Sequence, residues 1–113
     1  MKSCIFCKIS AKEIPAEMIY ENDDLVVFND INPKAPVHIL IVTKEHIANV
    51  DELGNDDKNL ISKMILIAQK IAREKGVAES GYRLVFNVKS HGGQEVEHIH
   101  LHLLGGKQLG SMV

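Results

Sequence analysis

The stretch His98-Ile99-His100-Leu101-His102-Leu103-Leu104 alternates histidines with aliphatic residues. A β-strand sends successive side chains to opposite faces, so this period of two predicts three imidazoles on one face and Ile99, Leu101 and Leu103 in the core. Histidine has no special preference for strands, so an amphipathic strand that is histidine-rich by chance is the less favoured interpretation. The pattern indicates a working site whose imidazoles bind a metal, move protons or attack an electrophile.

The size and composition of the chain predict one domain spanning residues 1–113. The hydrophobic fraction of 45% and charged fraction of 25% are typical of an ordinary globular protein. The formal net charge is -2, and the sequence has no basic run, so binding to long nucleic acid is disfavoured. The binding of small anionic ligands is compatible with this charge. The absence of a long apolar run disfavours a membrane span, and lysines near the start are unlike a secretory leader. We expect a cytoplasmic protein with no nucleic-acid polymer and no membrane as partner.

Turn signals divide the rest of the chain into short strands. Asn22-Asp23-Asp24 indicates a hairpin, and Asn32-Pro33-Lys34-Ala35-Pro36 forces a loop because each proline fixes its own φ and restricts its predecessor. A short N-terminal segment before Ile14-Pro15 can form one helical turn. The pattern predicts an α+β fold with a five-stranded antiparallel sheet, a short N-terminal helix and one long helix. The expected strands are Met18–Glu21, Leu25–Asn29, Val37–Thr43, Tyr82–Asn87 and Ile99–Leu104.

The long helix is expected from Asp57 to Lys75, with Gly76 just beyond its end. Its apolar residues form two adjacent stripes, so the apolar face is wider than contact with one sheet requires. This width favours a homodimer interface, and a deeply buried helix in a monomer is the alternative. The stripes are Leu60, Met64, Ile67 and Ile71, and Ile61, Ile65, Ala68 and Ala72.

A glycine-containing loop, Ser90-His91-Gly92-Gly93-Gln94, precedes the histidine strand. Glycines let a backbone approach a ligand closely, and exposed backbone N–H groups can surround phosphate oxygens. A histidine face beside such an anion-binding loop indicates phosphoryl or nucleotidyl transfer.

These residues closely resemble the signature of the histidine triad (HIT) family, His-φ-His-φ-His-φ-φ with φ hydrophobic, here His98–Leu104 between Gly92-Gly93-Gln94 and Gly105-Gly106. Further stretches are similar to the Hint-like branch of this family, and together they cover nearly the whole chain. They are Ile5-Phe6, Lys8-Ile9, Glu13-Ile14-Pro15, Asp30-Ile31-Asn32-Pro33, Ala35-Pro36, His38 and Lys44-Glu45-His46-Ile47.

The resemblance implies a homodimeric nucleotide hydrolase or transferase that cleaves purine nucleoside 5'-phosphoramidates or related conjugates at the α-phosphorus. His100 would be the nucleophile, forming a nucleotidyl-histidine that water hydrolyses to the nucleoside monophosphate. His102 would assist at the phosphate or leaving group, and His38 would support the site from a neighbouring strand. We expect His100→Ala to abolish hydrolysis and leave the fold intact, because a surface nucleophile can be removed without a core cavity.

The resemblance also implies a nucleotide-binding set. Asn87, Gly93 and Gln94 would contact the phosphate region, and Asp30 would accept hydrogen bonds from the ribose hydroxyls. Asp30 could instead cap a turn, and the apolar residues could be ordinary core. The residues expected to line the purine slot are Ile5, Phe6, Ile9, Phe28 and Ile31.

The chain departs from many Hint-like proteins at Glu95, where these carry a serine after the glutamine. A carboxylate close to a phosphate repels it unless it is turned away or protonated. No phosphate-binding role is therefore assigned to Glu95.

Cys4-x-x-Cys7, His46 and His98 have the ligand types of a Cys2His2 zinc site, in which two thiolates balance the charge of the ion. The set matches a subset of HIT-related proteins with a structural zinc, which would here anchor the N-terminal segment to the histidine strand. The alternative is a pair of partly buried thiols with both histidines in ordinary hydrogen bonds. A redox Cys-x-x-Cys is less favoured because the usual βαβ context is missing.

Two further functions compete with nucleotidyl transfer. His-x-His on a strand can hold a catalytic metal in a metal-dependent hydrolase, which needs a third ligand. The same scaffold can also serve as a non-catalytic module that binds nucleotides or partners.

Overall fold

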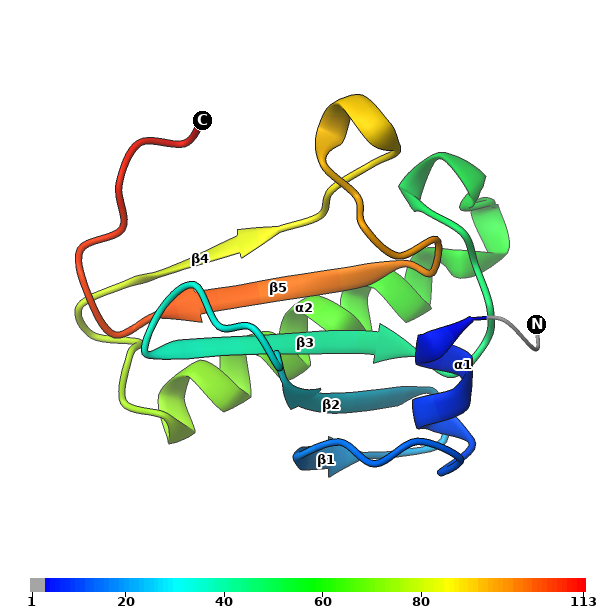
Figure 1. The fold of residues 1–113 in the computed structure, drawn as a ribbon, viewed down its shortest axis with the longest axis horizontal. Coiled ribbons are helices and arrows are strands. Elements are labelled where there is room, and N and C mark those ends of the chain that lie inside the picture. Colours follow the sequence, from blue (N-terminus) through cyan, green and yellow to red (C-terminus); the bar gives the residue numbers. More distant parts are fainter. Residues whose placement is uncertain (1–3) are drawn as a thin grey trace.

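The computed structural model describes residues 4–113 and shows one sheet with a helix on each side (Figure 1). The strands lie in the order β1-β2-β3-β5-β4, and every neighbouring pair is antiparallel. The long helix α2 runs behind the sheet, and the short helix α1 lies near the end of β3. The elements are α1 (Ile5–Ser10), β1 (Met18–Glu21), β2 (Leu25–Asn29), β3 (Val37–Thr43), α2 (Lys58–Glu74), β4 (Tyr82–Val85) and β5 (His100–Gly105), with short 3-10 turns at Val50–Glu52, Asn55–Asp57 and Ser90–Gly92.

The predicted α+β architecture is confirmed, and three strand boundaries differ: the end of β4 and both ends of β5, which runs on to Gly105. β4 ends at Val85, whose partner His102 is its last pairing on β5. β5 begins at His100, so His98 lies in a bend before the strand and not within it. The reason is that the backbone N–H of Ile99 donates to the carbonyl of Ile47, at 2.7 Å, outside the ladder with β3.

Alternation along the central strands divides the core into two layers. Side chains on one face pack against α2, and those on the other face pack against α1. On β2, for example, Leu25 and Val27 belong to the α2 layer, whereas Val26 and Phe28 belong to the α1 layer. His100 and His102 share the α1 side because Leu101 and Leu103 fill the α2 side. The face that carries the histidines is thus partly covered by a helix.

Helix α2 buries only part of its wide apolar face. Met64, Ala68 and Ala72 are fully buried, while Ile65 and Leu66 stay 41% and 60% exposed. The helix ends before Gly76, whose φ of 75° is the left-handed conformation that glycine adopts readily. Within residues 4–113, no helix combines the length and the apolarity needed to cross a membrane.

Candidate active site

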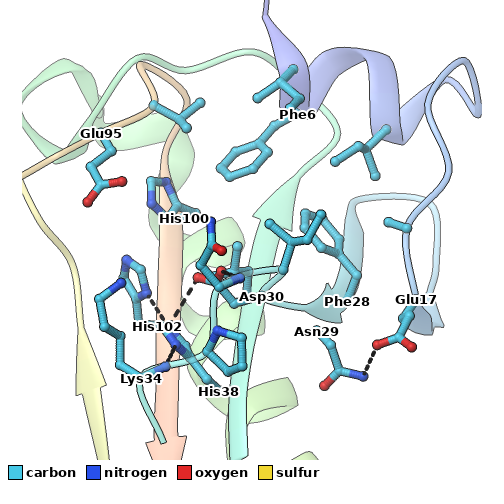
Figure 2. Close-up of a pocket in the computed structure, with 18 of the residues that line it drawn as sticks. Phe6, Glu17, Phe28, Asn29, Asp30, Lys34, His38, Glu95, His100 and His102 are labelled. Atoms are coloured by element: carbon cyan, nitrogen blue, oxygen red, sulfur yellow. Dashed lines mark hydrogen bonds and ion pairs between the residues drawn. The ribbon is translucent and has the colours of Figure 1, made fainter.

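A cavity of about 1110 Å³ opens on the α1 side of the sheet (Figure 2). Its lining comes from α1, from the segment before β1, from β2 and the loop after it, from β3, β4 and β5, and from the loop between β4 and β5. Apolar residues form one wing, and the polar residues Asp30, His38, His100 and His102 gather beside it. The apolar wing contains Ile5, Phe6, Ile9, Ile14, Phe28 and Leu40.

A chain of hydrogen bonds orients two of these histidines. The backbone N–H of Lys34 donates to Nδ1 of His38 at 3.0 Å, so the hydrogen of neutral His38 sits on Nε2. Nε2 of His38 lies 2.9 Å from Nδ1 of His102 and 3.3 Å from Oδ2 of Asp30. Nδ1 of His102 therefore accepts, and the remaining N–H of this ring is on Nε2. Cross-strand register produces the contact, because His102 lies opposite Leu40 and diagonal to His38.

His100 is oriented by its own main chain. Its Nδ1 donates to the carbonyl of His98 at 2.7 Å, which leaves the lone pair on Nε2. The ring stacks edge-on against Phe6 with centroids 5.0 Å apart and is only 6% exposed. The description of His100 as a surface side chain is therefore wrong, because α1 covers this part of the sheet.

Burial keeps these imidazoles neutral. Desolvation lowers the pKa of His100, although the carbonyl of His98 and the charges of Asp30 and Glu95 oppose the shift. Desolvation, with the charges of His100 and His38, lowers the pKa of His102 to about 4. A neutral His100 keeps the free electron pair that nucleophilic or basic chemistry requires.

The residues expected to contact the base and the ribose all line the cavity. Phe6, Ile9 and Phe28 are also members of the buried core layer, so a core role and a lining role coexist. Ile31 is 91% exposed at the rim, which burial in a core does not explain. Asp30 accepts the backbone N–H of Asn32 through Oδ1 at 2.8 Å, as a turn cap does, and its Oδ2 still faces the histidines.

The loop before β5 is built differently from the expected anion cradle. The backbone N–H groups of Gly92, Gly93 and Gln94 donate to carbonyls of the same loop. The side chain of Gln94 is also occupied: Oε1 accepts from Lys89 N–H at 2.9 Å, and Nε2 donates to the carbonyls of Ala48 and Val96 at 2.7 and 2.9 Å. Gln94 does not line the cavity, so the prediction that it touches phosphate needs correction: it shapes the loop instead.

The same loop places other groups at the cavity. Asn87 lines it and donates one amide hydrogen to the carbonyl of Gly92 at 2.8 Å, which leaves the second hydrogen free. Gly93, also in the lining, has a φ of 78° that favours glycine. Within residues 4–113, the backbone N–H groups of Glu95 and Val96 make no hydrogen bond, and both residues line the cavity.

Lys34 is a lining residue that the sequence analysis left out. Its neighbours Pro33 and Pro36 indicated only a loop, and nothing in the local sequence tells which way that loop folds. The bond from its backbone N–H to His38 brings it to the site.

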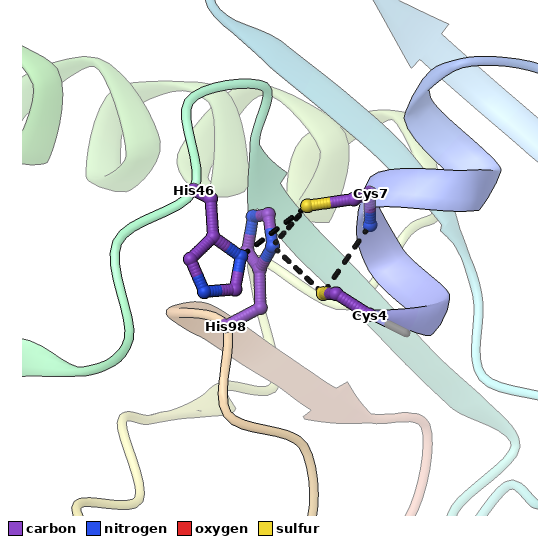
Figure 3. Close-up of side chains that lie close together, drawn as sticks. All are labelled: Cys4, Cys7, His46 and His98. Carbon is purple, nitrogen blue, oxygen red and sulfur yellow. Dashed lines mark hydrogen bonds between the residues drawn. The ribbon is translucent and has the colours of Figure 1, made fainter. Parts of the chain in front are cut away.

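A second cluster joins Cys4, Cys7, His46 and His98 (Figure 3). Sγ of Cys4 lies 3.3 Å from Nδ1 of His98, and Sγ of Cys7 lies 3.2 Å from Nδ1 of His46 and 3.6 Å from Nδ1 of His98. Tetrahedral zinc with ordinary bond lengths separates sulfur from nitrogen ligands by about 3.6 Å. The predicted convergence is confirmed, and the four donors fit one metal ion.

The environment of His98 suits a metal ligand. Its Nε2 donates to the carbonyl of Thr43 at 2.7 Å, so the lone pair on Nδ1 points at the two sulfurs. The ring is fully buried, and desolvation lowers its pKa to about 4, which keeps it neutral. Desolvation and the neighbouring Cys4 raise the pKa of Cys7, so a cation is needed to stabilise two thiolates here.

A catalytic metal among the histidines is less well supported. His98 faces the cysteines and His100 faces a carbonyl, so these two rings do not converge on one ion. Asp30, His38 and His102 do come together, with ligand atoms within 4.8 Å of one another. The hydrogen on Nε2 of His38, however, occupies the position where a metal would bind.

Comparison with known proteins identifies relatives of this chain. A family model described as "Scavenger mRNA decapping enzyme C-term binding" matches residues 3–112. The chain is 48% identical over 109 residues to the purine nucleoside phosphoramidase of Escherichia coli K12, covering 96% of this chain and 92% of that protein.

Solved structures show the same relationship. A HIT family hydrolase from Legionella pneumophila superposes with a TM-score of 0.94 at 51% identity, covering 96% of each chain. A zinc-bound histidine triad family protein from Mycobacterium smegmatis has a TM-score of 0.82 at 29% identity, covering 94% of this chain and 76% of that one. The chain thus belongs to the histidine triad (HIT) family, and the histidine row His98, His100 and His102, which begins just before β5 and continues into it, is its signature.

Proposed function

We propose that this protein hydrolyses purine nucleoside 5'-phosphoramidates, or related nucleotide conjugates, at the α-phosphorus through a nucleotidyl-histidine intermediate. The observation that carries the proposal is the orientation of His100: its Nδ1 donates to the carbonyl of His98, and its free Nε2 belongs to a neutral ring in the cavity lining. The E. coli relative, named for a purine nucleoside phosphoramidase activity, supports the substrate class.

The reaction proceeds in two displacements. Nε2 of His100 attacks the α-phosphorus, the phosphorus–nitrogen bond to the leaving amine breaks, and the amine departs with a proton supplied by Nε2–H of His102. Water then attacks the nucleotidyl-histidine and gives its proton back to Nε2 of His102, while the phosphorus–nitrogen bond to His100 breaks, which releases the nucleoside monophosphate and returns the electron pair to Nε2 of His100.

Neighbouring groups assist by holding hydrogens at defined atoms. Nε2–H of His102 is directed away from His38 and can donate to a phosphate oxygen or to the leaving nitrogen. The backbone N–H of Val96 and the free amide hydrogen of Asn87 are donors for phosphate oxygens, and at Glu95 the main-chain N–H, but not the carboxylate, is a further donor. Donors held in place before the reaction stabilise charge that develops in the transition state.

The nucleoside occupies the apolar wing. Phe6 and Phe28, with ring centroids 5.7 Å apart, provide aromatic surface for the purine, and Ile9 and Ile31 extend it. Asp30 accepts hydrogen bonds from the ribose hydroxyls, since each of its oxygens keeps a second lone pair. This arrangement places the α-phosphate beside His100 and His102.

The deciding experiment is chemical trapping. Enzyme quenched during turnover of an adenosine phosphoramidate is digested and analysed by mass spectrometry, and we expect adenylate attached to His100. Inversion at phosphorus without any adduct would instead indicate direct attack by water. Nucleotide binding without turnover of any phosphoramidate or dinucleotide would favour the non-catalytic module.

The acid side of the pH profile is a second test. The neutral imidazoles are the reactive forms, and burial holds the pKa of His100 below the ordinary value of about 6.5 and that of His102 at about 4. We expect kcat/KM to stay level as the pH falls through 6.5 and to decline only at lower pH. Initial rates corrected for uncatalysed hydrolysis measure this, and an apparent pKa of 6.5 or above would contradict it.

We also propose that Cys4, Cys7, His46 and His98 hold a structural zinc ion, as the donor geometry and the zinc-bound relative suggest. Bound zinc would stabilise both thiolates and tie the loop after β3 and the start of β5 to α1. Because Phe6 lies on α1 between the two cysteines, the same tie would hold one wall of the apolar wing.

A homodimer is the proposed assembly. Strand β4 lies at one edge of the sheet, with half-buried side chains throughout, and α2 exposes Ile65 and Leu66. An edge strand of this kind can pair with a second copy and remove its unpaired backbone groups. Light scattering is expected to give the mass of two chains of 12.6 kDa each, and a monomer at micromolar concentration would contradict the assembly.

A further inference from the structure

Lys34 brings an ammonium group to the cavity that the proposed reaction does not use. The residue belongs to the loop between β2 and β3, and its backbone N–H donates to Nδ1 of His38 at 3.0 Å. This bond fixes the base of the side chain next to the histidines, while the side chain itself is exposed and lines the cavity. Among residues 4–113, no carboxylate forms an ion pair with it. The charge is therefore available to a ligand.

The ammonium lies at one end of the histidine row. Figure 2 shows Lys34 beside His102 and across the cavity from Phe28, whereas Glu95 lies beside His100. The charge effects agree with this placement. The positive charge of Lys34 lowers the pKa values of His38 and His102, whereas the negative charge of Glu95 works to raise the pKa of His100. Lys34 is thus separated from the apolar wing that receives the base.

The direction of attack links this end of the cavity to the leaving group. In a displacement at phosphorus, the attacking and leaving atoms lie roughly in line on opposite sides. His100 packs against Phe6, and His102 and Lys34 lie on its other side, so the leaving amine departs toward His102 and Lys34. We propose that Lys34 binds a carboxylate carried by this amine, so that nucleoside phosphoramidates of carboxylate-bearing amines are preferred. The inference rests on the proposed function and names the leaving-group class for the same site.

The other charges of the cavity favour a single carboxylate over a polyphosphate. Glu17, Asp30 and Glu95 also line the cavity, and Lys34 is its one ammonium among the described residues. A polyanionic leaving group would be repelled by these carboxylates, whereas a single carboxylate needs only one positive partner, which Lys34 provides. The contact is solvent-exposed, so we expect a preference of about two- to fivefold.

The test compares two adenosine 5'-phosphoramidates of nearly equal size, one made from glycine and one from glycinamide. Wild-type protein is expected to show kcat/KM about two- to fivefold higher for the glycine compound, with the ratio approaching one at high salt. Lys34→Gln should bring the ratio to about one, Lys34→Arg should keep it, and the control Lys75→Gln, at the end of α2, should keep it. Because each ratio is taken within one variant, a general loss of activity does not affect it.

Two results would overturn the inference. One is a wild-type ratio of one, and the other is a Lys34→Gln variant that weakens both compounds equally, which would place the ammonium on the α-phosphate. Calorimetric Kd values for the two compounds with His100→Asn protein test the same preference without catalysis. If neither compound is turned over but the Kd ratio holds, the proposed function fails and the role of Lys34 stands. Equal Kd values overturn that role.

Discussion

Replacing His100 by alanine is expected to lower kcat/KM for an adenosine phosphoramidate on the order of 10⁴-fold or more. The reason is that Nε2 of this ring is the atom proposed to bond to phosphorus, and neither His38 nor His102 presents a free lone pair to the cavity. The measurement is steady-state turnover by protein produced in a host that lacks its own enzyme of this type. The adenylate adduct should vanish from the trapping experiment in parallel.

The structure adds a consequence for stability. His100 is 6% exposed and packs against Phe6, so alanine leaves a void beside that ring. A destabilisation of about 1–2 kcal/mol is expected, while the domain stays folded. His100→Asn fills more of the space and lacks a nucleophilic nitrogen, so it separates chemistry from packing.

The matched control is His91→Ala, which removes an exposed imidazole outside the cavity lining. Its turnover should stay near that of the wild type. Substantial activity in purified His100→Asn protein would show that another group attacks phosphorus, and the assignment of His100 would then be wrong.

Removing one zinc ligand is expected to have the second large effect. Cys7→Ser keeps the size of the side chain but loses the thiolate that faces both His46 and His98. If free zinc is about 1,000 times the Kd, the bound ion adds roughly 4 kcal/mol to the free energy of unfolding. For a domain of this size, the loss corresponds to a fall in melting temperature of about 10 °C or more.

Three measurements check this expectation. Metal analysis of wild-type protein purified without chelator should give about one zinc per chain, and Cys7→Ser should give much less. Chelator should lower the melting temperature of the wild type and leave that of Cys7→Ser unchanged. Affinity for adenosine monophosphate should weaken too, because Phe6 lies on α1, the helix that Cys4 caps and that carries Cys7.

Ser10→Ala is the control, since it alters the same helix away from the donor atoms. Its zinc content and melting temperature should match those of the wild type. Wild-type protein with less than about a tenth of an equivalent of zinc would defeat the structural-zinc proposal and leave two partly buried thiols hydrogen-bonded to histidines.

The boundary of β5 illustrates the limit of reading a strand from its period. The alternation that starts at His98 correctly predicted that Leu101 and Leu103 face α2, because that side is set by the pleat of the strand. The backbone at Ile99, however, bonds to Ile47 and not to β3, so the strand begins only at His100. A hydrogen-bond partner on a loop that is distant in sequence cannot be inferred from the alternation of residues within the strand.

Gln94 shows the same limit for a site residue. The resemblance to the HIT family implied a phosphate contact, yet the amide bonds to Lys89, Ala48 and Val96 and shapes the loop. Polar side chains satisfy whichever backbone groups the folded chain brings near them, and the carbonyl of Ala48 is distant in sequence.

The sequence alone determined the layered α+β fold, the histidine face and the donor types of the metal cluster, because alternation and side-chain chemistry are local properties. Only the tertiary structure decided that Cys4 meets His98 across 94 positions of the chain. It also decided which nitrogen of each histidine is free, since the carbonyl of His98 and the N–H of Lys34 set the tautomers. These hydrogen-bond partners are backbone groups, and they reach the histidine rings only after the strands have paired and the loops have folded against the sheet.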